Sequence, residues 1–377
     1  MQGGVRKRGK KWYYYFDVGT VDGKRKKIER VGGDTKAEAL KALREALAEF
    51  ERAGTIIDES NISVADYFDY WYENYVRVNC KYNTQEYYKR IIENHIKPAL
   101  GIYKLKSLNP AILQKFLNSK YINGYSKNSL TNFYGVLSKA MKMAVYPYQF
   151  IKENPMQYVE LPRIEEKEKD KDDLKIITLE EFNRIIERFP EGSSFYIPCQ
   201  IAFHTGMRAG EVCALMWDHV DLKEKTITVE YTLIGKGKGI WELGTPKTKS
   251  SYRTIEIGDT LVNILKKHRK NQLENKLRYG KYYKDSNFVC TKENGELVTP
   301  DSLKYLSKVV NYELDIDFNF HSLRHTHATM LLEAGANIKD IQRRLGHSRV
   351  STTIDTYSHV TKKMKRDTVN IFESMLK

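Results

Sequence analysis

Several polar side chains lie at positions where a protein core would not favour them. Arg208 stands in "HTGMRAGE", and Arg324 stands in "HSLRHTHAT", three residues after His321. Residues three apart share one face of a helix, so His321 and Arg324 are expected to lie together. The stretch "LGHSRVSTTIDTYSH" adds His347 and, ten residues later, Tyr357. When side chains of these three types are buried, they need an anionic partner or one another's hydrogen bonds.

Two guanidiniums, two imidazoles and a phenol together indicate a phosphate site. Arginine is planar and forked, so two arginines can bind the non-bridging oxygens of one phosphate in a bidentate way. The charge of a pentacoordinate phosphorane develops on those oxygens, where guanidiniums already in place stabilise it. No acidic cluster for Mg²⁺ accompanies these residues, which disfavours two-metal nuclease chemistry.

A zinc site is one alternative for the same residues. His321 and His325 have the spacing of a helical zinc pair. However, position 322 is not glutamate, and Arg324 would place a cation beside the ion. A second alternative is that these histidines and arginines are unrelated surface residues.

The elements that must position these residues belong to a long, basic chain. Its 377 residues are 41% hydrophobic and 29% charged, which predicts two or three globular domains. Lys and Arg number 63 against 48 Asp and Glu, a formal net charge of +15. Such an excess points to a polyanion, whether DNA, RNA or a membrane surface, although an unspecialised basic surface is an alternative.

The composition also indicates where the protein works. No stretch approaches the ~18 apolar residues of a membrane span, and the first thirty residues contain no apolar signal core. The four cysteines lie far apart and predict reduced thiols in a cytosolic protein: Cys80, Cys199, Cys213 and Cys290. We expect a cytoplasmic protein associated with the nucleoid, with no membrane partner.

Residues 1–55 predict a small basic β-sheet with a helix behind it. The aromatic run that starts at Trp12 favours strands, and Asp22-Gly23 is a strong hairpin signal. Thr35 and Glu38 predict a capping box at the start of a helix that runs to Gly54. A sheet of this kind suits a DNA groove, and a plain folded appendage is the alternative. We predict DNA contacts by Arg6, Lys7, Arg8, Lys10, Lys11, Lys24, Arg25, Lys26 and Lys27.

Residues 61–162 predict an all-α unit of four helices. We expect Pro98 and Gly101 to stop the second helix, and Asn109 with Pro110 to start the third. Nine consecutive charged residues at 165–173 predict a linker, which we place at 163–175.

Residues 176–377 predict a mixed α+β unit that is mainly helical. Thr178 and Glu181 form a capping box at its start, and three strands in sequence, forming one sheet, are expected within 225–258. The fold class is therefore multidomain, with a small sheet-plus-helix domain, an all-α domain and a mixed domain.

The four motifs resemble the tyrosine recombinase (phage integrase) family. The matching stretches are "TGMRAGE", "PKTKSSYRTI", "HSLRHTHAT" and "LGHSRVSTTIDTYSH", and they span the whole of 176–377. The matching residues, in order, are Arg208, Lys247, His321, Arg324, His347 and Tyr357. The helical unit resembles the family's core-site-binding domain. The N-terminal sheet resembles the arm-site-binding domain of integrases from phages and conjugative transposons.

The resemblance implies a 3′-phosphotyrosyl bond to DNA, with Tyr357 as the nucleophile. A free phenol has a pKa of about 10, so neighbouring cations and a base must assist it. Arg208 and Arg324 match the two arginines that clamp the phosphate. His321 matches the residue that assists proton transfer at the nucleophile, and His347 matches a hydrogen-bonder to the phosphate.

A lysine on the second hairpin of the sheet matches the general acid for the 5′-oxygen. "PKTKSSYRT" offers both Lys247 and Lys249. The family pattern of Lys-Thr, a short loop and then Arg favours Lys247, because Arg253 follows at the next strand. Glu211 matches an acidic position beside the first arginine, where it would orient a neighbour.

The resemblance further implies an integrase that integrates and excises a mobile genetic element. The phosphotyrosine preserves the energy of the phosphodiester, so no metal, ATP or other cofactor is expected. The expected partners are double-stranded core and arm sites, three further copies of the chain in a homotetramer, an excisionase and a DNA-bending host protein. The alternatives are a chromosome or plasmid dimer resolvase, which usually lacks the arm domain, and a non-catalytic DNA-binding regulator. The tail after Tyr357 is expected to pack on its own domain or on a neighbouring subunit.

Overall fold

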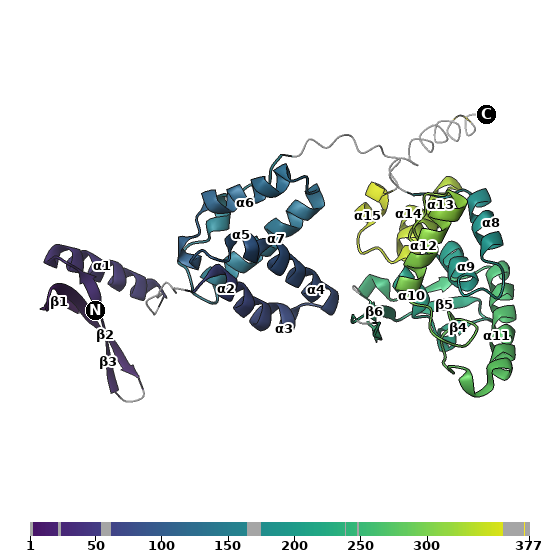
Figure 1. Ribbon diagram of the computed structural model, residues 1–377, viewed down its shortest axis with the longest axis horizontal. Coiled ribbons are helices and arrows are strands. Elements are labelled where there is room, and N and C mark those ends of the chain that lie inside the picture. Colours follow the sequence, from purple (N-terminus) through teal and green to yellow (C-terminus); the bar gives the residue numbers. More distant parts are fainter. Residues whose placement is uncertain are drawn as a thin grey trace. The chain divides into compact units, whose positions relative to one another are not determined.

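The computed structural model describes residues 3–21, 24–53, 62–163, 175–237, 239–246, 249–356 and 373. The chain divides into two compact units, Met1–Glu165 and Glu166–Lys377 (Figure 1). The first unit contains both the N-terminal sheet and the helical region, and the second contains the predicted catalytic residues. Most of the predicted linker, residues 164–174, lies outside the described residues.

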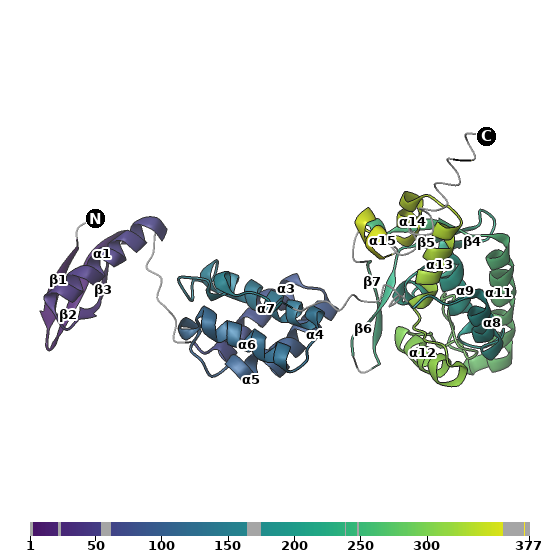
Figure 2. The same ribbon diagram turned by 90° about the horizontal axis from the view of Figure 1, so that it is seen from above.

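The first unit begins with an antiparallel sheet and one helix. Its elements are β1 (Gly3–Arg8), β2 (Lys11–Val21), β3 (Lys24–Gly33) and α1 (Lys36–Ala53). The strand order is β1-β2-β3, and Figure 2 shows α1 lying along the sheet. Tyr14 and Phe16 of β2 pack against Leu43 and Ala46 of α1. Because side chains alternate along a strand, the neighbours of Tyr14 and Phe16 project from the face without a helix.

The local signals around this sheet have different outcomes. The predicted capping box is present, since Glu38 N–H donates to Thr35 Oγ1 at 3.2 Å and Thr35 N–H donates to Glu38 Oε2 at 3.3 Å. The predicted turn at Asp22-Gly23 lies outside the described residues, although β2 and β3 pair on either side of it.

The rest of the first unit is helical. Its elements are α2 (Val64–Trp71), the π-helical turn η1 (Tyr72–Val76), α3 (Arg77–Asn79), α4 (Tyr82–Ile91), the π-helical turn η2 (Ile92–Ile96), α5 (Lys97–Leu100), η3 (Leu105–Ser107), α6 (Pro110–Ile122), α7 (Lys127–Val145) and η4 (Pro155–Tyr158). Val64, Phe68 and Trp71 of α2 are buried in its core. Asn109 caps α6 by accepting from Ile112 N–H at 3.0 Å, as predicted.

The prediction that Pro98 ends the second helix is wrong. The helical backbone runs from α4 through η2 into α5, and the turn ends at Gly101. Pro98 lies in the first turn of α5, directly after the wider π-helical turn. In that turn Lys97 N–H donates to the Ile92 carbonyl five residues back, and the wider backbone leaves room for the proline ring within a continuous helix.

The second unit combines helices with two small sheets. Its helices are α8 (Leu179–Arg188), α9 (Tyr196–Thr205), α10 (Ala209–Cys213), η5 (Trp217–His219), η6 (Lys249–Ser251), α11 (Asp259–Tyr279), η7 (Gly280–Tyr282), α12 (Pro300–Leu314), α13 (Ser322–Glu333), α14 (Ile338–Leu345) and α15 (Val350–Thr356). Its strands are β4 (Val220–Asp221), β5 (Thr226–Val229), β6 (Thr232–Gly235), β7 (Trp241–Gly244) and β8 (Arg253–Glu256). The capping box of Thr178 and Glu181 is present at α8.

The strand prediction for this unit is correct in type and wrong in pairing. The expected first strand is divided into β5 and β6, and the three-stranded sheet has the order β4-β5-β8. β6 and β7 form a separate two-stranded ribbon. Ile227 and Val229 of β5 are buried in the core, and in the ribbon Leu233 of β6 is buried while Leu243 of β7 is exposed. Apolar alternation detects a strand, but it does not specify which partner the strand takes.

Two glycines end helices one or two residues before predicted catalytic residues. Gly206 caps α9 with a φ of 68°, and Gly346 caps α14 with a φ of 69°. Such left-handed conformations favour glycine. A Cβ at Gly206 would also lie 2.7 Å from Leu345 Cδ2. These turns end α9 and α14 and lead the chain into the segments that carry Arg208 and His347. Over the described ranges, the chain has no helix that is long and apolar enough to cross a membrane.

Candidate active site

Arg324 lies at the centre of the second unit, in the first turn of α13. Only 2% of the residue is exposed. Its Nη1 donates to the Gly206 carbonyl and its Nη2 to the Leu345 carbonyl, both at 2.7 Å. Both acceptors lie at helix C-termini, where backbone carbonyls carry partial negative charge. These bonds orient the guanidinium, but because a carbonyl is neutral they do not cancel its charge.

Arg208 reaches the same turn from the start of α10. Its Nη2 lies 3.4 Å from the Gly346 carbonyl, one residue after the carbonyl that Arg324 binds. Its Nη1 donates to Glu211 Oε1 at 2.8 Å, and its backbone N–H donates to Glu211 Oε2 at 3.0 Å. The side chain is 37% exposed. The two predicted arginines therefore converge at one helix end, with Arg208 open to solvent and Arg324 beneath the surface.

Glu211 lies between two arginines and is almost fully buried. Arg253 Nη2 donates to its Oε2 at 2.9 Å, opposite the bond from Arg208. Burial raises the pKa of the Glu211 carboxyl, but Arg253 and Arg208 outweigh burial and hold that pKa below its ordinary value. The carboxylate is therefore charged at neutral pH, and its bond with Nη1 orients the Arg208 side chain.

His321 and His325 form a close pair beside Arg324. Their ring centroids lie 4.7 Å apart, with the planes at 87°. Burial, helped by the neighbouring His325, Arg324 and Arg208, lowers the pKa of His321 to about 4. Burial and Arg324 lower the pKa of His325 to about 4 as well. Both imidazoles are therefore neutral at pH 7, and a neutral imidazole can accept a proton.

His347 follows the Gly346 turn and contacts the next helix. Its Nδ1 lies 2.8 Å from the hydroxyl of Thr353, a buried residue of α15. When the hydroxyl donates to Nδ1, the ring proton resides on Nε2, where it can be donated to a ligand. Burial, together with Arg324 and Arg208, lowers the pKa of His347 to about 4.

Two of the six predicted catalytic residues, Lys247 and Tyr357, lie outside the described residues. The backbone of the alternative lysine, Lys249, belongs to η6, and its side chain also lies outside the described part. α15 ends at Thr356. The structure thus brings Arg208, His321, Arg324 and His347 together and leaves the lysine and the tyrosine as predictions.

A supporting network that was not predicted from the sequence lies behind these residues. Arg253 Nε donates to the Arg344 carbonyl at 2.6 Å, which fixes the end of α14. Arg344 in turn donates through Nε to His327 Nε2 at 2.9 Å. His327 Nδ1 lies 2.8 Å from the Phe203 carbonyl, and therefore carries the proton. The available signals were the arginines in "RRLGH" and the third histidine in "HSLRHTHAT". However, Arg253 lies more than ninety residues from Arg344, and His327 lies more than a hundred residues from Phe203.

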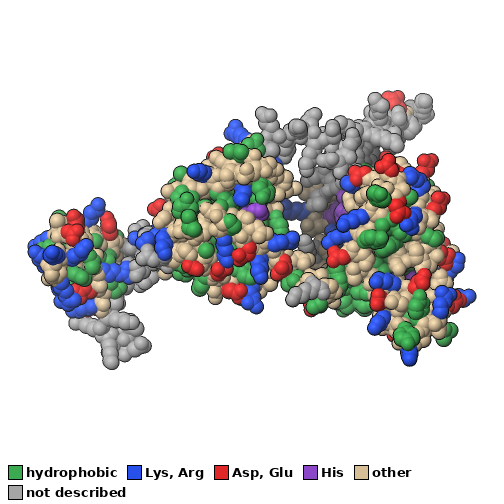
Figure 3. Space-filling model, in the orientation of Figure 1, with side chains coloured by type: hydrophobic (Ala, Val, Ile, Leu, Met, Phe, Trp, Pro, Cys, Tyr) green, Lys and Arg blue, Asp and Glu red, His purple; other side chains and the backbone are tan. Residues whose placement is uncertain are grey.

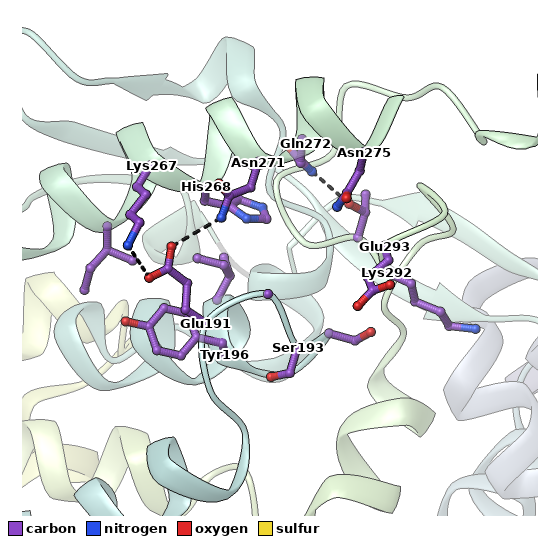
Figure 4. Close-up of a pocket in the computed structure, with 15 residues that line it drawn as sticks. Glu191, Ser193, Tyr196, Lys267, His268, Asn271, Gln272, Asn275, Lys292 and Glu293 are labelled. Atoms are coloured by element: carbon purple, nitrogen blue, oxygen red, sulfur yellow. Dashed lines mark hydrogen bonds and ion pairs between the residues drawn. The ribbon is translucent and has the colours of Figure 1, made fainter. Parts of the chain in front are cut away.

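A pocket of this unit lies elsewhere. It is lined by α11 and by the segment before α9, and Figure 4 shows Glu191 facing Lys267 and Asn271. Lys267 Nζ lies 2.6 Å from Glu191 Oε2. None of the described predicted catalytic residues lines this pocket. A site that binds a DNA backbone must be open, so enclosure is a poor guide here. No group of three metal-ligating side chains suited to an ion is found among the described residues.

The predicted DNA contacts of the N-terminal sheet are divided between its two faces. In the antiparallel pairing of β1 with β2, Arg6 lies opposite Tyr13 and Arg8 lies opposite Lys11, on the face away from α1. Lys27 pairs with Asp17 on the same face. Lys and Arg side chains are prominent on the visible surface of this sheet (Figure 3).

The remaining predicted contacts have other positions. Lys7 alternates to the face that carries α1, and Lys10 lies in the turn between β1 and β2. The side chains of three residues of β3 lie outside the described part: Lys24, Arg25 and Lys26. One surface therefore does not collect all nine residues, and a single DNA contact would use a subset of them.

Three family models match the chain. The phage integrase family matches residues 175–364, a SAM-like N-terminal domain of phage integrases matches residues 63–121, and an arm DNA-binding domain matches residues 5–50.

Two relatives with similar sequences agree with these matches. A tyrosine recombinase XerC-like protein of Caldanaerobacter subterraneus subsp. tengcongensis is 30% identical over 359 residues, which are 91% of this chain and 90% of that protein. An integrase of Staphylococcus phage L54a is 30% identical over 328 residues, covering 82% and 92%.

The fold is similar to that of two integrases with solved structures. The Tn1549 transposon integrase, in complex with a circular intermediate DNA, has a TM-score of 0.66 at 20% identity and covers 81% of this chain and 99% of that chain. A lambda integrase tetramer bound to a Holliday junction has a TM-score of 0.56 at 16% identity, covering 93% and 94%.

Proposed function

This chain belongs to the phage integrase family of tyrosine recombinases, and we propose that the centre around Arg324 cuts and rejoins DNA through a 3′-phosphotyrosyl bond to Tyr357. The protein is a site-specific DNA recombinase of the integrase type. The similarity to a phage integrase supports a mobile genetic element as its substrate. The observation that carries the proposal is the convergence of two guanidiniums on consecutive carbonyls at the end of α14.

This convergence favours a phosphate between the two arginines. Two backbone carbonyls orient the Arg324 guanidinium, and these bonds do not neutralise its charge. Arg208 is partly exposed and can reach a ligand from solvent. Together they would hold the non-bridging oxygens and stabilise the charge that grows there in the transition state. His347 would add a hydrogen bond from Nε2.

Proton transfers complete the proposed step. The phenolic oxygen of Tyr357 bonds to phosphorus as the bond from phosphorus to the 5′-oxygen breaks. The phenolic proton passes to neutral His321, and Lys247 gives a proton to the 5′-oxygen. A bound phosphate anion raises the low pKa of His321, which favours this transfer. A 5′-hydroxyl of another strand then attacks the phosphotyrosine and restores the phosphodiester, so the residues need no cofactor.

The rest of the chain would bind DNA in separate places. We assign residues 1–55 to arm sites, residues 61–162 to core sites, residues 163–175 to a linker and residues 176–377 to catalysis. The family matches at 5–50 and 63–121 support the first two assignments. Recombination needs two duplexes, and the tetramer of lambda integrase supports a homotetramer here. An excisionase and a DNA-bending host protein would set direction at the nucleoid of the bacterial cell.

Removing residues 1–55, which contain the N-terminal sheet, tests whether the protein is an integrase or a dimer resolvase. A chain lacking residues 1–55 should cleave a short core duplex at nearly the full rate and fail to recombine complete sites. Equal recombination by both chains would instead favour the resolvase.

Charge variants of the full chain make the same test without a deletion. Arg8 and Lys11 face each other on the open side of the sheet, and each phosphate contact adds about −0.9 to the slope of log K against log salt. Arg8→Ala with Lys11→Ala should therefore flatten that slope for arm DNA by roughly 2. The matched control removes two exposed cations of α1, through Lys41→Ala with Arg44→Ala, and should leave the slope unchanged.

A further inference from the structure

The open face of the N-terminal sheet carries a carboxylate among its cations. Glu29 pairs with Tyr15 in register, on the face away from α1. Arg6 Nε donates to Glu29 Oε1 at 2.7 Å, and Arg6 Nη2 donates to Glu29 Oε2. Arg8 Nε lies 3.7 Å from Glu29 Oε1. The carboxylate therefore forms a two-bond fork with one arginine and lies beside a second.

A surface that bound only phosphates would be weakened by this arrangement. Affinity for the DNA backbone comes from cations that displace counterions, and a carboxylate repels the phosphates and offsets a cation. The hydrogen bond from Arg6 lowers the pKa of Glu29, so the carboxylate is charged at neutral pH. Glu29 thus reduces non-specific binding, and its benefit must come from the direction that it gives to Arg6.

The fork leaves one edge of the Arg6 guanidinium facing outward. Glu29 occupies the Nε–Nη2 edge, and within the described residues Nη1 has no protein acceptor. The ring of Tyr15 lies 5.5 Å from the guanidinium carbon and supports its flat side. The Arg6 side chain is 48% exposed. Two parallel N–H groups on a fixed arginine match the O6 and N7 acceptors of guanine in the major groove.

We propose that Glu29 is a positioning residue for base readout, which holds Arg6 so that its outer edge binds O6 and N7 of a guanine in the arm site. The inference rests on the proposed arm-site function and specifies how the sheet recognises sequence. Phosphate contacts by the other cations of this face fix the register, and the Arg6 fork selects the base. Glu29 also increases specificity in a second way. Its carboxylate repels the phosphates of DNA, and this repulsion is not offset at sites that have no guanine for Arg6.

Selection from a random duplex pool tests this proposal with the full chain. Duplexes with a randomised central window are bound by the wild type, Glu29→Gln, Arg6→Lys and Glu45→Gln, and the retained DNA is sequenced. Glutamine keeps the shape of Glu29 but turns an NH₂ group toward Arg6, so the two-bond fork is lost. Arg6→Lys keeps the charge and loses the planar edge. Glu45 is an exposed acid of α1, so Glu45→Gln is the matched control for the charge change.

We expect the wild type to enrich a motif with one fixed guanine. Glu29→Gln and Arg6→Lys should each lower the preference for that guanine about tenfold, the usual value of one bidentate contact. Total DNA retained by Glu29→Gln should equal or exceed that of the wild type, which a damaged fold would not give. Glu45→Gln should reproduce the wild-type motif.

Two different failures can be told apart. If Arg6→Lys loses the guanine and Glu29→Gln keeps it at the wild-type level, Arg6 reads the base without help and the role of Glu29 is wrong. If neither variant changes the guanine preference of any enriched motif, Arg6 does not read bases, and the proposal is overturned while the arm-site function can stand. The arm-site function itself fails if Arg8→Ala with Lys11→Ala also leaves all motifs and their yields unchanged.

Discussion

The proposed catalytic centre and the N-terminal sheet are both cationic, yet they hold their arginines in opposite ways. Arg324 is buried and bonded to two backbone carbonyls. Arg6 is about half exposed and paired with the carboxylate of Glu29. Neutral partners orient a cation and leave its charge for a ligand, whereas an anionic partner fixes direction and gives up much of the charge. The first arrangement suits stabilisation of a transition state, and the second suits recognition.

Charge-preserving substitution in the centre should have the largest effect. Arg324→Lys keeps a cation but cannot donate to two carbonyls and a phosphate in fixed directions. Strand cleavage should fall by about 10³–10⁵, the range known for arginines that stabilise a transferred phosphoryl group. DNA affinity should change little, because phosphate and core contacts elsewhere remain. Single-turnover cleavage of a nicked core duplex measures this effect.

A neighbouring arginine supplies the control for that experiment. Arg343 lies on α14 with an 81% exposed side chain, so Arg343→Lys should cleave at the wild-type rate. If Arg324→Lys were as active as Arg343→Lys, positive charge alone would suffice in the centre. The contrast between the two regions would then not hold.

The lysine assignment extends the centre beyond the described residues. Lys247→Ala should slow cleavage by roughly 10²–10⁴, the usual contribution of a general acid. A substrate with a 5′-bridging phosphorothiolate has a better leaving group and should largely restore the rate. Lys249→Ala is the matched control and should cleave ordinary DNA normally. Rescue of Lys249→Ala in place of Lys247→Ala would move the role to position 249.

Acid should weaken the catalytic unit and spare the N-terminal sheet. The pKa values of His321, His325 and His347 lie at about 4, and that of His327 at about 3, chiefly through burial. Each is depressed in the folded state, so the unfolded chain binds more protons below pH ~6.5 and stability falls as pH falls toward 4. Residues 1–53 contain no histidine.

The effect of each single histidine is small beside the catalytic losses. Allowing for solvent screening, each of the four histidines should contribute about 1 kcal/mol of lost stability at pH 5. Urea unfolding at pH 7 and pH 5, followed by tryptophan fluorescence, measures the change. An unfolding free energy that is equal at the two pH values would mean that these imidazoles are not held neutral by burial.

Signals from neighbouring residues predicted where several helices begin. They failed where the structure depends on contacts between residues far apart in the sequence. The capping boxes at Thr35 and Thr178 and the Asn109 cap depend on residues three positions apart, and all three were predicted. The prediction for Pro98 failed because a π-helical turn precedes it, and the wider backbone of that turn accommodates a proline without ending the helix. The sheet order β4-β5-β8 depends on pairing between segments that periodicity treats alike.

The site shows the same division. Motif order predicted Arg208, His321, Arg324 and His347, and the structure brings them together. The links from Arg253 to Arg344 and from His327 to Phe203 were missed, because each joins residues far apart in sequence through a backbone carbonyl. The donor side chains are visible in the sequence, but the acceptor of each contact is not, since any residue can supply a backbone carbonyl.

The attachment site on Tyr357 tests the central claim most directly. The full chain is trapped on a nicked core duplex, the covalent complex is digested with a protease, and the DNA-linked peptide is identified by mass spectrometry. Mapping is necessary because the chain contains 26 tyrosines. We expect a single adduct on Tyr357, and a Tyr357→Phe chain that binds the same duplex with equal affinity and forms none. An adduct on another tyrosine, or one that persists in Tyr357→Phe, would contradict the account.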